Sequence, residues 1–250
     1  MTTVLVLGGV RSGKSAYAER LLQGRDQVVY VAAGPAPSSA DPDWLARVRA
    51  HRNRRPATWL TVEAGPGRHP GIGGTNSLLD SAPCPAPPAA AASTGPGAAA
   101  RGVDLPALVA GLEPSAAALV DCLGTWVTRL IDDAGAWEDR TRVEALLAGQ
   151  TERLVQALRS GRGDVVLVSN ETGLGVVPAS ASGRLVRDRL GRLNATVAAA
   201  CDHTVLVVAG RVLDLTATPT IDAASTFGLS GSVGARLEHS GKSSAADAGI

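Results

Sequence analysis

A glycine-rich segment near the start of the chain has the residue types and spacing of a polyphosphate-binding loop. Its residues are Gly8, Gly9, Val10, Arg11, Ser12, Gly13, Lys14 and Ser15, which satisfy the pattern G-x-x-x-x-G-K-[ST]. In such a loop, backbone N–H groups surround a polyphosphate, the lysine meets the outer phosphates and the serine hydroxyl binds Mg²⁺. Lys14 stands out because only one other lysine, Lys242, occurs among the 24 basic residues. A mere tight turn explains neither the full pattern nor the isolated lysine.

An aspartate at the end of an apolar stretch is a second candidate for nucleotide chemistry. The stretch 117–121 ends at Asp121, and enzymes with this kind of loop place a Mg²⁺-binding carboxylate at such a strand end. Any buried strand can also end in an aspartate, so the residues leave both interpretations open. On the first interpretation, Ser15 and Asp121 are the predicted Mg²⁺ ligands, and the Mg²⁺ binds together with the substrate, GTP or ATP.

A histidine surrounded by arginines ends the second predicted helix. The segment 51–56 reads HRNRRP. Taken alone, it favours an ordinary helix end, where cations offset the negative end of the helix dipole and Pro56 stops the helix. The alternative is chemical: a histidine kept neutral by neighbouring arginine charges is a competent nucleophile toward phosphorus, and the arginines can receive the phosphate oxygens.

The elements that must position these residues follow an alternation of strands and helices. Short runs rich in Val, Leu and Ala predict strands at 3–7, 27–32, 117–121, 164–169 and 204–208. Segments of helical period predict helices at 14–22, 41–54, 125–134, 138–160 and 183–201. The strands are almost continuously apolar, as in a parallel sheet covered on both faces. We therefore predict an α/β fold, a P-loop NTPase-like three-layer sandwich with a mostly parallel sheet flanked by helices.

Two stretches depart from this alternation. Between residues 70 and 100 the only charged residue is Asp80, and Pro, Ala and Gly dominate. We interpret this region as an insertion at about 65–115 without regular structure, because repeated proline blocks both helices and interior strands. After about residue 216 the chain becomes rich in Ser, Thr, Gly and Ala. The sequence thus predicts one domain over 1–215, interrupted by the insertion, and a flexible tail over 216–250.

Composition narrows the classes of function. Lys plus Arg is 24 and Asp plus Glu is 23, so the formal net charge is +1, and we expect no nucleic-acid partner. No run reaches the ~18 apolar residues of a membrane span, and the start of the chain lacks the pattern of a secretion signal. We therefore expect a cytoplasmic protein. The three cysteines are scattered and fit neither a disulfide framework nor a zinc site.

Four motifs in order give the chain a recognisable resemblance. Residues 8–15 read GGVRSGKS, 51–59 read HRNRRPATW, 119–126 read LVDCLGTW and 168–178 read VSNETGLGVVP. The set resembles the bifunctional adenosylcobinamide kinase/adenosylcobinamide-phosphate guanylyltransferase family of cobalamin biosynthesis. The segments 184–194, RLVRDRLGRLN, and 204–210, TVLVVAG, continue the match. The resemblance covers residues 1 to about 215 apart from the insertion.

The resemblance implies two reactions on one domain. The hydroxyl of the aminopropanol arm of adenosylcobinamide is first phosphorylated by ATP or GTP. The enzyme then takes GMP from GTP onto a histidine, releases pyrophosphate and passes GMP to the cobinamide phosphate. The family's guanylylated histidine falls on His51. The substrates are thus GTP or ATP and adenosylcobinamide, with Mg²⁺ and no tightly bound organic cofactor, and the resemblance implies a homo-oligomer.

Further roles follow from the resemblance by position. The catalytic residues are His51 and Lys14. The nucleotide-binding residues are Gly8, Gly9, Val10, Arg11, Ser12, Gly13, Lys14, Ser15, Ala32, Ala33, Gly34, His51, Arg52, Asn53, Arg54, Glu63 and Asp121. Asn170 and Glu171 follow a predicted parallel strand at its carboxyl end, where ligands bind in open α/β sheets, and are candidates for orienting the substrate.

Two other functions fit parts of the sequence. A simple P-loop kinase for a small hydroxylated metabolite would leave His51 with a structural role only. A GTP-binding regulatory module would bind nucleotide without transferring any group, but the chain shows no evident N-K-x-D segment for reading guanine. A covalent guanylyl–histidine separates both from the bifunctional transferase.

Overall fold

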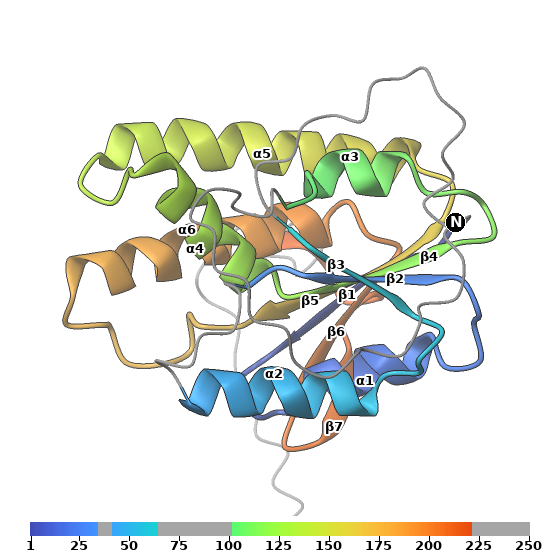
Figure 1. Ribbon diagram of the computed structural model, residues 1–250. Helices are drawn as coiled ribbons and strands as arrows, with labels where there is room; N and C mark the ends of the chain where they lie inside the picture. Colours follow the sequence, from blue (N-terminus) through green and yellow to red (C-terminus); the bar gives the residue numbers. More distant parts are fainter. Residues whose placement is uncertain (35–41, 65–101, 222–250) are drawn as a thin grey trace, which may run out of the picture. The chain divides into compact units, whose positions relative to one another are not determined.

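The computed structural model describes residues 1–34, 42–64 and 102–221 (Figure 1). It divides the chain into two compact units, Met1–Thr216 and Ala217–Ile250. The predictions for residues 65–101 and for the tail beyond 221 lie outside the described residues. The elements below all belong to the first unit.

A seven-stranded sheet forms the centre of this unit, in the order β3-β2-β4-β5-β1-β6-β7. The strands are β1 (Thr3–Gly8), β2 (Val28–Ala32), β3 (Leu60–Glu63), β4 (Ala117–Asp121), β5 (Asp164–Asn170), β6 (His203–Val208) and β7 (Arg211–Asp214). All neighbouring pairs are parallel except β6 and β7, which form an antiparallel pair at one edge. The parallel order brings the carboxyl ends of β1 to β5 to one edge of the sheet.

Helices cover both faces of this sheet (Figure 1). They are α1 (Lys14–Leu21), α2 (Pro42–Arg54), α3 (Leu105–Ala110), α4 (Leu123–Ala134), α5 (Arg140–Ser160) and α6 (Ala181–Ala198). The helices α1 and α2 lie on one face and α3 to α6 on the other. The predicted P-loop NTPase-like three-layer α/β sandwich is confirmed.

Alternation along the strands explains why the sheet carries two cores. Successive side chains of a strand point to opposite faces. Val29 and Val31 of β2 belong to the core beneath α3 to α6, whereas Val28 and Tyr30 belong to the core that also holds Ala18 of α1. A strand with apolar side chains in both directions has its lowest free energy in the middle layer.

Three elements were not predicted from the sequence, and one of them corrects the insertion. The short strands β3 and β7 have only four residues each. The helix α3 lies inside the range assigned to the insertion, with Leu105 and Val109 buried. It begins where Asp104 accepts a hydrogen bond from the Ala107 N–H at 2.9 Å, and the Val103 N–H donates to the Glu63 carbonyl at 2.7 Å. The predicted boundary at 115 is therefore wrong, because residues 102–115 pack onto the domain.

The register of the sheet places the predicted site residues side by side. Gly8 at the end of β1 pairs with Asn170 at the end of β5. Ala32 at the end of β2 pairs with both Asp121 of β4 and Glu63 of β3. Residues separated by up to 162 positions thus meet at one sheet edge. No helix among the described residues is long and apolar enough to cross a membrane.

Candidate active site

The phosphate loop connects β1 to α1, and its backbone requires its glycines. A Cβ on Gly8 would lie 2.5 Å from Ser12 Oγ and 2.7 Å from the Val207 carbonyl oxygen. Gly13 has φ +99°, a conformation that glycine adopts at no steric cost. Gly9 and Val10 are exposed, as is Arg11, so the outer rim of the loop faces solvent. The sequence thus folds into an open turn that a triphosphate can reach.

Lys14 lies in the first turn of α1 with its ammonium group folded over the loop. The residue is 4% exposed, and its Nζ donates to the Gly9 carbonyl at 3.1 Å. Ser12 Oγ is buried and has no hydrogen-bond partner among the described residues. The first turn of α1 contains no acidic residue. A buried cation, a free hydroxyl and a helix N-terminus together favour an anion at this loop.

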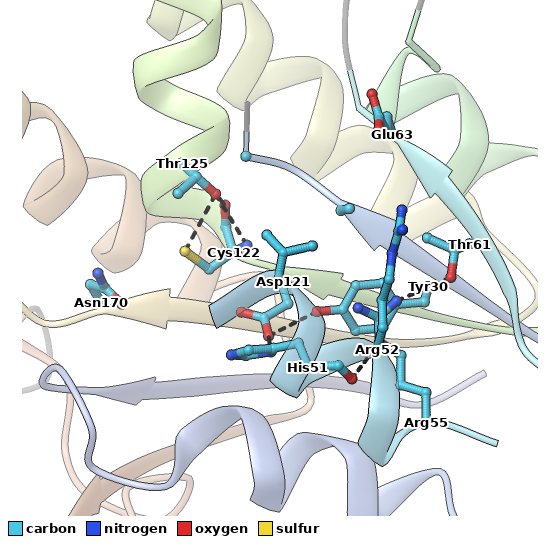
Figure 2. A pocket seen from close by; sticks show the side chains of 13 residues that line it. Tyr30, His51, Arg52, Arg55, Thr61, Glu63, Asp121, Cys122, Thr125 and Asn170 are labelled. Atoms are coloured by element: carbon cyan, nitrogen blue, oxygen red, sulfur yellow. Dashed lines mark hydrogen bonds and ion pairs between the residues drawn. The ribbon is translucent and has the colours of Figure 1, made fainter. Parts of the chain in front are cut away.

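His51 lies in the last turn of α2 and contacts the end of β4. Its Nδ1 is 3.3 Å from Asp121 Oδ2, and both side chains are largely buried. The Tyr30 hydroxyl, from β2, donates to the same carboxylate oxygen at 3.0 Å. Figure 2 shows the three side chains converging on this oxygen. The cluster therefore joins α2, β2 and β4 at the edge of the sheet that also carries the phosphate loop.

The electrostatics of the cluster keep Asp121 charged and Tyr30 protonated. Burial acts to raise the pKa of the Asp121 carboxyl, but the hydrogen bonds from His51, Ser15 and Tyr30 and the charge of His51 outweigh it, so this pKa lies below its usual value. Burial, reinforced by the negative charge of Asp121, holds the pKa of Tyr30 well above its usual value. At neutral pH the tyrosine is therefore a permanent donor and the aspartate a permanent acceptor.

Arg55 ties the end of α2 to two strands. Its guanidinium carbon lies 3.4 Å from the centroid of the Tyr30 ring. Its Nε donates to the His51 carbonyl at 3.0 Å, and its Nη1 donates to Thr61 Oγ1 of β3 at 3.0 Å. Burial lowers the pKa of Arg55 from its usual value. The guanidinium thus links the backbone at His51 to the sheet.

Many of the predicted residues line a pocket beside this cluster. Ala32, Gly34, His51, Arg52, Glu63, Asp121 and Asn170 line it together with Tyr30, Val48, Arg55, Thr61, Cys122 and Thr125. Figure 2 shows Glu63 on β3, at a distance from the His51 cluster. Asn170 Oδ1 is buried and has no hydrogen-bond partner among the described residues. The pocket therefore offers both charges and free polar atoms to a ligand.

Other predicted residues lie outside this pocket. Arg54 makes two hydrogen bonds to Glu19 of α1, at 3.0 and 3.2 Å, and Asn53 is exposed. Ala33 is fully buried. Glu171 accepts a hydrogen bond from the Gly173 N–H at 2.9 Å, and its own N–H donates to the Gly8 carbonyl at 3.1 Å. The structure thus places Glu171 beside the phosphate loop rather than in the pocket.

The phosphate loop and the pocket meet at Asp121. Gly8 to Ser15 do not line the pocket, but the Ser15 side chain is near enough to Asp121 to help lower the pKa of its carboxyl. Mg²⁺ at a phosphate site commonly takes only one or two protein oxygens and completes its shell with phosphates and water. No group of three or more His, Cys, Asp and Glu side chains among the described residues suits a metal. The adjacent hydroxyl and carboxylate therefore fit a nucleotide-borne Mg²⁺.

Sequence reasoning missed several polar residues of the pocket, among them Tyr30, Arg55 and Thr61. Tyr30 sits inside an apolar strand, where its hydroxyl was the only polar signal. Arg55 follows the histidine by four residues, one helical turn, but was not among the predicted site residues. Thr61 belongs to a strand too short to be predicted. Their roles depend on which strands become neighbours, which local sequence does not specify.

Comparison with known proteins identifies the family. A model of the family described as cobinamide kinase / cobinamide phosphate guanyltransferase matches residues 4–71 and 100–215. The chain belongs to this family. The resemblance drawn from the four motifs is thereby confirmed. The family match omits residues 72–99, which is a shorter extra segment than the predicted 65–115.

Curated relatives of this family align over most of the chain. Two of them, from Salmonella typhimurium and Escherichia coli, are named bifunctional adenosylcobalamin biosynthesis protein CobU; they are 33% and 32% identical, and each alignment covers 83% of this chain and 96% of the relative. The bifunctional adenosylcobalamin biosynthesis protein CobP of Pseudomonas aeruginosa is 33% identical, with 86% and 98% covered. Among solved structures, the P4 protein of bacteriophage phi6 in complex with ADP is 15% identical with a TM-score of 0.37, covering 84% of this chain and 52% of P4.

Proposed function

We propose that this protein catalyses two successive transfers in cobalamin biosynthesis. It phosphorylates the aminopropanol hydroxyl of adenosylcobinamide with ATP or GTP, and then transfers GMP from GTP, through a guanylyl group on His51, to give adenosylcobinamide-GDP and pyrophosphate. Membership of the family supports both activities. The observation that carries the assignment of His51 is its position in a pocket that adjoins the phosphate loop through Asp121.

The phosphate loop serves the first transfer. The substrate hydroxyl oxygen attacks the γ-phosphorus and releases its proton to solvent, the bond from the γ-phosphorus to the bridging oxygen breaks, and the nucleoside diphosphate leaves with that electron pair. Backbone N–H groups of residues 8–15 and the Lys14 ammonium offset the charge that moves onto the leaving oxygens. Ser15 and Asp121 would hold Mg²⁺, which supplies further charge neutralisation when bound with the nucleotide. Glu171, adjacent to Gly8, and Asn170 orient the substrate.

His51 serves the second transfer. The lone pair of its imidazole attacks the α-phosphorus of GTP, and the bond to the pyrophosphate oxygen breaks. The phosphate of cobinamide phosphate then attacks the same phosphorus and frees the imidazole. Arg52 and Arg55 add positive charge to the pocket and favour the phosphates of the incoming nucleotide. Glu63 remains a candidate contact for the rest of the GTP molecule.

The remaining expectations complete the proposal. The substrates are GTP or ATP and adenosylcobinamide, with no tightly bound organic cofactor and no nucleic-acid partner. We place the protein in the cytoplasm, as a homo-oligomer, with a catalytic domain over residues 1–215. The tail is assigned no part in either transfer.

The proposal is tested by separating the two activities with single variants. Purified protein is incubated with adenosylcobinamide, ATP, GTP and Mg²⁺, and both products are quantified for the wild type, Lys14→Ala and His51→Gln. We expect Lys14→Ala to lose both products. His51→Gln should still form adenosylcobinamide phosphate but no adenosylcobinamide-GDP. His203→Gln, an exposed histidine at the start of β6, is the matched control and should behave as the wild type.

Each alternative function predicts a different pattern. A simple kinase would give the phosphate product alone in the wild type as well. A regulatory GTP-binding module would bind nucleotide and form neither product. Adenosylcobinamide-GDP formed at the wild-type rate by His51→Gln would overturn the role of the histidine.

A further inference from the structure

We propose that Asp121, held in place by Tyr30, is the positioning residue that selects the reacting nitrogen of His51. The carboxylate keeps the proton on Nδ1, so that Nε2 presents its lone pair to the α-phosphorus of GTP. This inference rests on the proposed function and adds two roles to it. Asp121 orients the imidazole in addition to its proposed role as a Mg²⁺ ligand, and Tyr30 orients Asp121.

The ring of His51 contacts the Asp121 carboxylate through its Nδ1 atom. A neutral imidazole has one N–H donor and one nitrogen lone pair, and an ionised carboxylate can only accept. Because Nδ1 is the ring atom 3.3 Å from Asp121 Oδ2, the N–H must be on Nδ1. The other tautomer would set a nitrogen lone pair against a carboxylate lone pair in a largely buried contact. Nε2 is therefore the nucleophile.

The Asp121 carboxylate is held in place by Tyr30. Tyr30 is 2% exposed, and its hydroxyl donates to the same Oδ2 atom at 3.0 Å. Arg55 covers the Tyr30 ring and is itself held by Thr61 and by the His51 carbonyl. The Tyr30 ring cannot leave its place without losing the Arg55 contact, and its hydroxyl cannot turn away without losing the hydrogen bond to Asp121. Two donors from different elements thus hold one carboxylate oxygen in a single orientation.

The Asp121 carboxylate also offsets the charge that develops on the ring during the transfer. When Nε2 forms its bond to phosphorus and pyrophosphate departs with the electron pair, the ring keeps its Nδ1 proton and becomes positively charged. The Asp121 carboxylate already lies beside that proton, so it offsets the new charge without rearrangement. The same pairing keeps the imidazole a good leaving group for the second half of the transfer.

The tautomer of His51 is directly measurable. We suggest nitrogen NMR of protein labelled with ¹⁵N at the histidine rings, without nucleotide or metal, recorded at increasingly alkaline pH until the ring resonances no longer move. The His51 resonances are identified by their loss in His51→Gln. We expect the Nδ1–H tautomer in the wild type. Asp121→Asn should give a mixture of the two tautomers, because its amide can donate or accept. Tyr30→Phe should also increase the fraction of the Nε2–H tautomer, but by less. Tyr17→Phe is the matched control and should leave the spectrum unchanged.

The rate of guanylyl transfer onto the protein supplies the second readout. Loss of the orienting carboxylate in a comparable His–Asp pair reduces turnover by about 10⁴-fold, so we expect Asp121→Asn to slow labelling by about 100-fold or more. Tyr30→Phe leaves the proposed Mg²⁺ ligands intact, and we expect it to slow labelling by about 5-fold. Circular dichroism and melting curves show whether each variant is folded.

The outcomes separate this inference from the proposed function. If GTP labels the wild type at His51 but its ring carries the proton on Nε2, or Asp121→Asn leaves its resonances unchanged, the positioning role is overturned and the proposed function stands. If Asp121→Asn shifts the resonances and Tyr30→Phe does not, the role of Tyr30 is overturned. If no guanylyl group forms on His51 in the wild type, the proposed function itself fails.

Discussion

The phosphate loop and the His51 pocket lie at the same edge of the sheet but are built in different ways. The loop consists of eight consecutive residues, and its lysine bonds to a carbonyl only five positions away. The cluster around His51 draws on α2, β2, β3 and β4, and the hydrogen bond from Tyr30 to Asp121 spans 91 positions. The first is therefore a local structure, whereas the second exists only once the sheet has formed.

This difference has a consequence for how each region tolerates change. The loop depends on backbone conformation, so a single added methyl group can disrupt it while the domain remains folded. The pocket depends on side chains that contact one another across strands. The loss of activity should therefore differ in size from one substitution to the next, according to which contact is removed. Four substitutions test this contrast.

We expect the largest effect from Gly8→Ala. The new methyl group would collide with the Val207 backbone oxygen and with Ser12 Oγ, so the loop must move. Because both transfers use the loop, we expect both to fall by about 100-fold or more. Steady-state assays of each product test this, with Gly149→Ala in α5 as the control, since nothing lies within 4 Å of a Cβ there. Equal activity in the two variants would refute the tight fit at Gly8.

Arg55→Gln should separate the two regions. It removes the guanidinium from the Tyr30 ring and weakens the hold on the His51 carbonyl. We expect guanylyl transfer to fall by about 10- to 100-fold and phosphorylation by less than about 3-fold, with partial recovery in Arg55→Lys. An equal loss of both activities would mean that Arg55 stabilises the whole domain and not the position of His51 alone.

Asn194→Ala should affect stability more than chemistry. Asn194 is buried, accepts from Ser169 Oγ at 2.6 Å and donates to the Asn170 carbonyl at 3.0 Å. Its loss leaves two polar groups unpaired, so we expect the free energy of unfolding to fall by about 1–3 kcal/mol. Denaturant titration measures this. Fully folded variant protein should keep most of both activities; a selective loss of one would place Asn170 more directly in that reaction.

The smallest effect is expected for Arg54→Ala. The resemblance assigns this residue to GTP, but its guanidinium is paired with Glu19 at the surface. An exposed pair of this kind stabilises a protein by only about 0–1 kcal/mol, and we expect the KM for GTP to change by less than about 2-fold. Arg52→Ala, whose residue lines the pocket, is the informative partner and should raise this KM more. The reverse order would restore Arg54 as a nucleotide contact.

The contrast between the two regions also explains what the sequence could predict. The loop, its strand and its helix follow from contiguous patterns. All five predicted strands and all five predicted helices formed within a few residues of their expected positions. The four-residue strands β3 and β7 offer too short a pattern, and α3 was concealed by the proline-rich segment before it. The partners of Tyr30 and Arg55 lie on neighbouring strands, and which strands are neighbours is decided by the fold of the whole domain.

The assignment of residues to the site shows the same limit. His51, Arg52, Glu63 and Asp121 were predicted from motifs and line one pocket. Motif position alone gave no means of telling Arg52, which faces the pocket, from Arg54, which faces α1. Residues two positions apart on a helix point in directions about 200° apart, and only packing decides which of these directions faces the pocket.

The central claim is that the imidazole of His51 carries GMP between GTP and the second substrate. The most direct measurement is mass spectrometry of the protein digested after incubation with GTP and Mg²⁺ under conditions that preserve phosphorus–nitrogen bonds. We predict a GMP adduct on the peptide that contains His51, and its loss when adenosylcobinamide phosphate is added, with the same amount of adenosylcobinamide-GDP formed. An adduct on Lys14, or turnover to adenosylcobinamide-GDP without any adduct, would contradict the account.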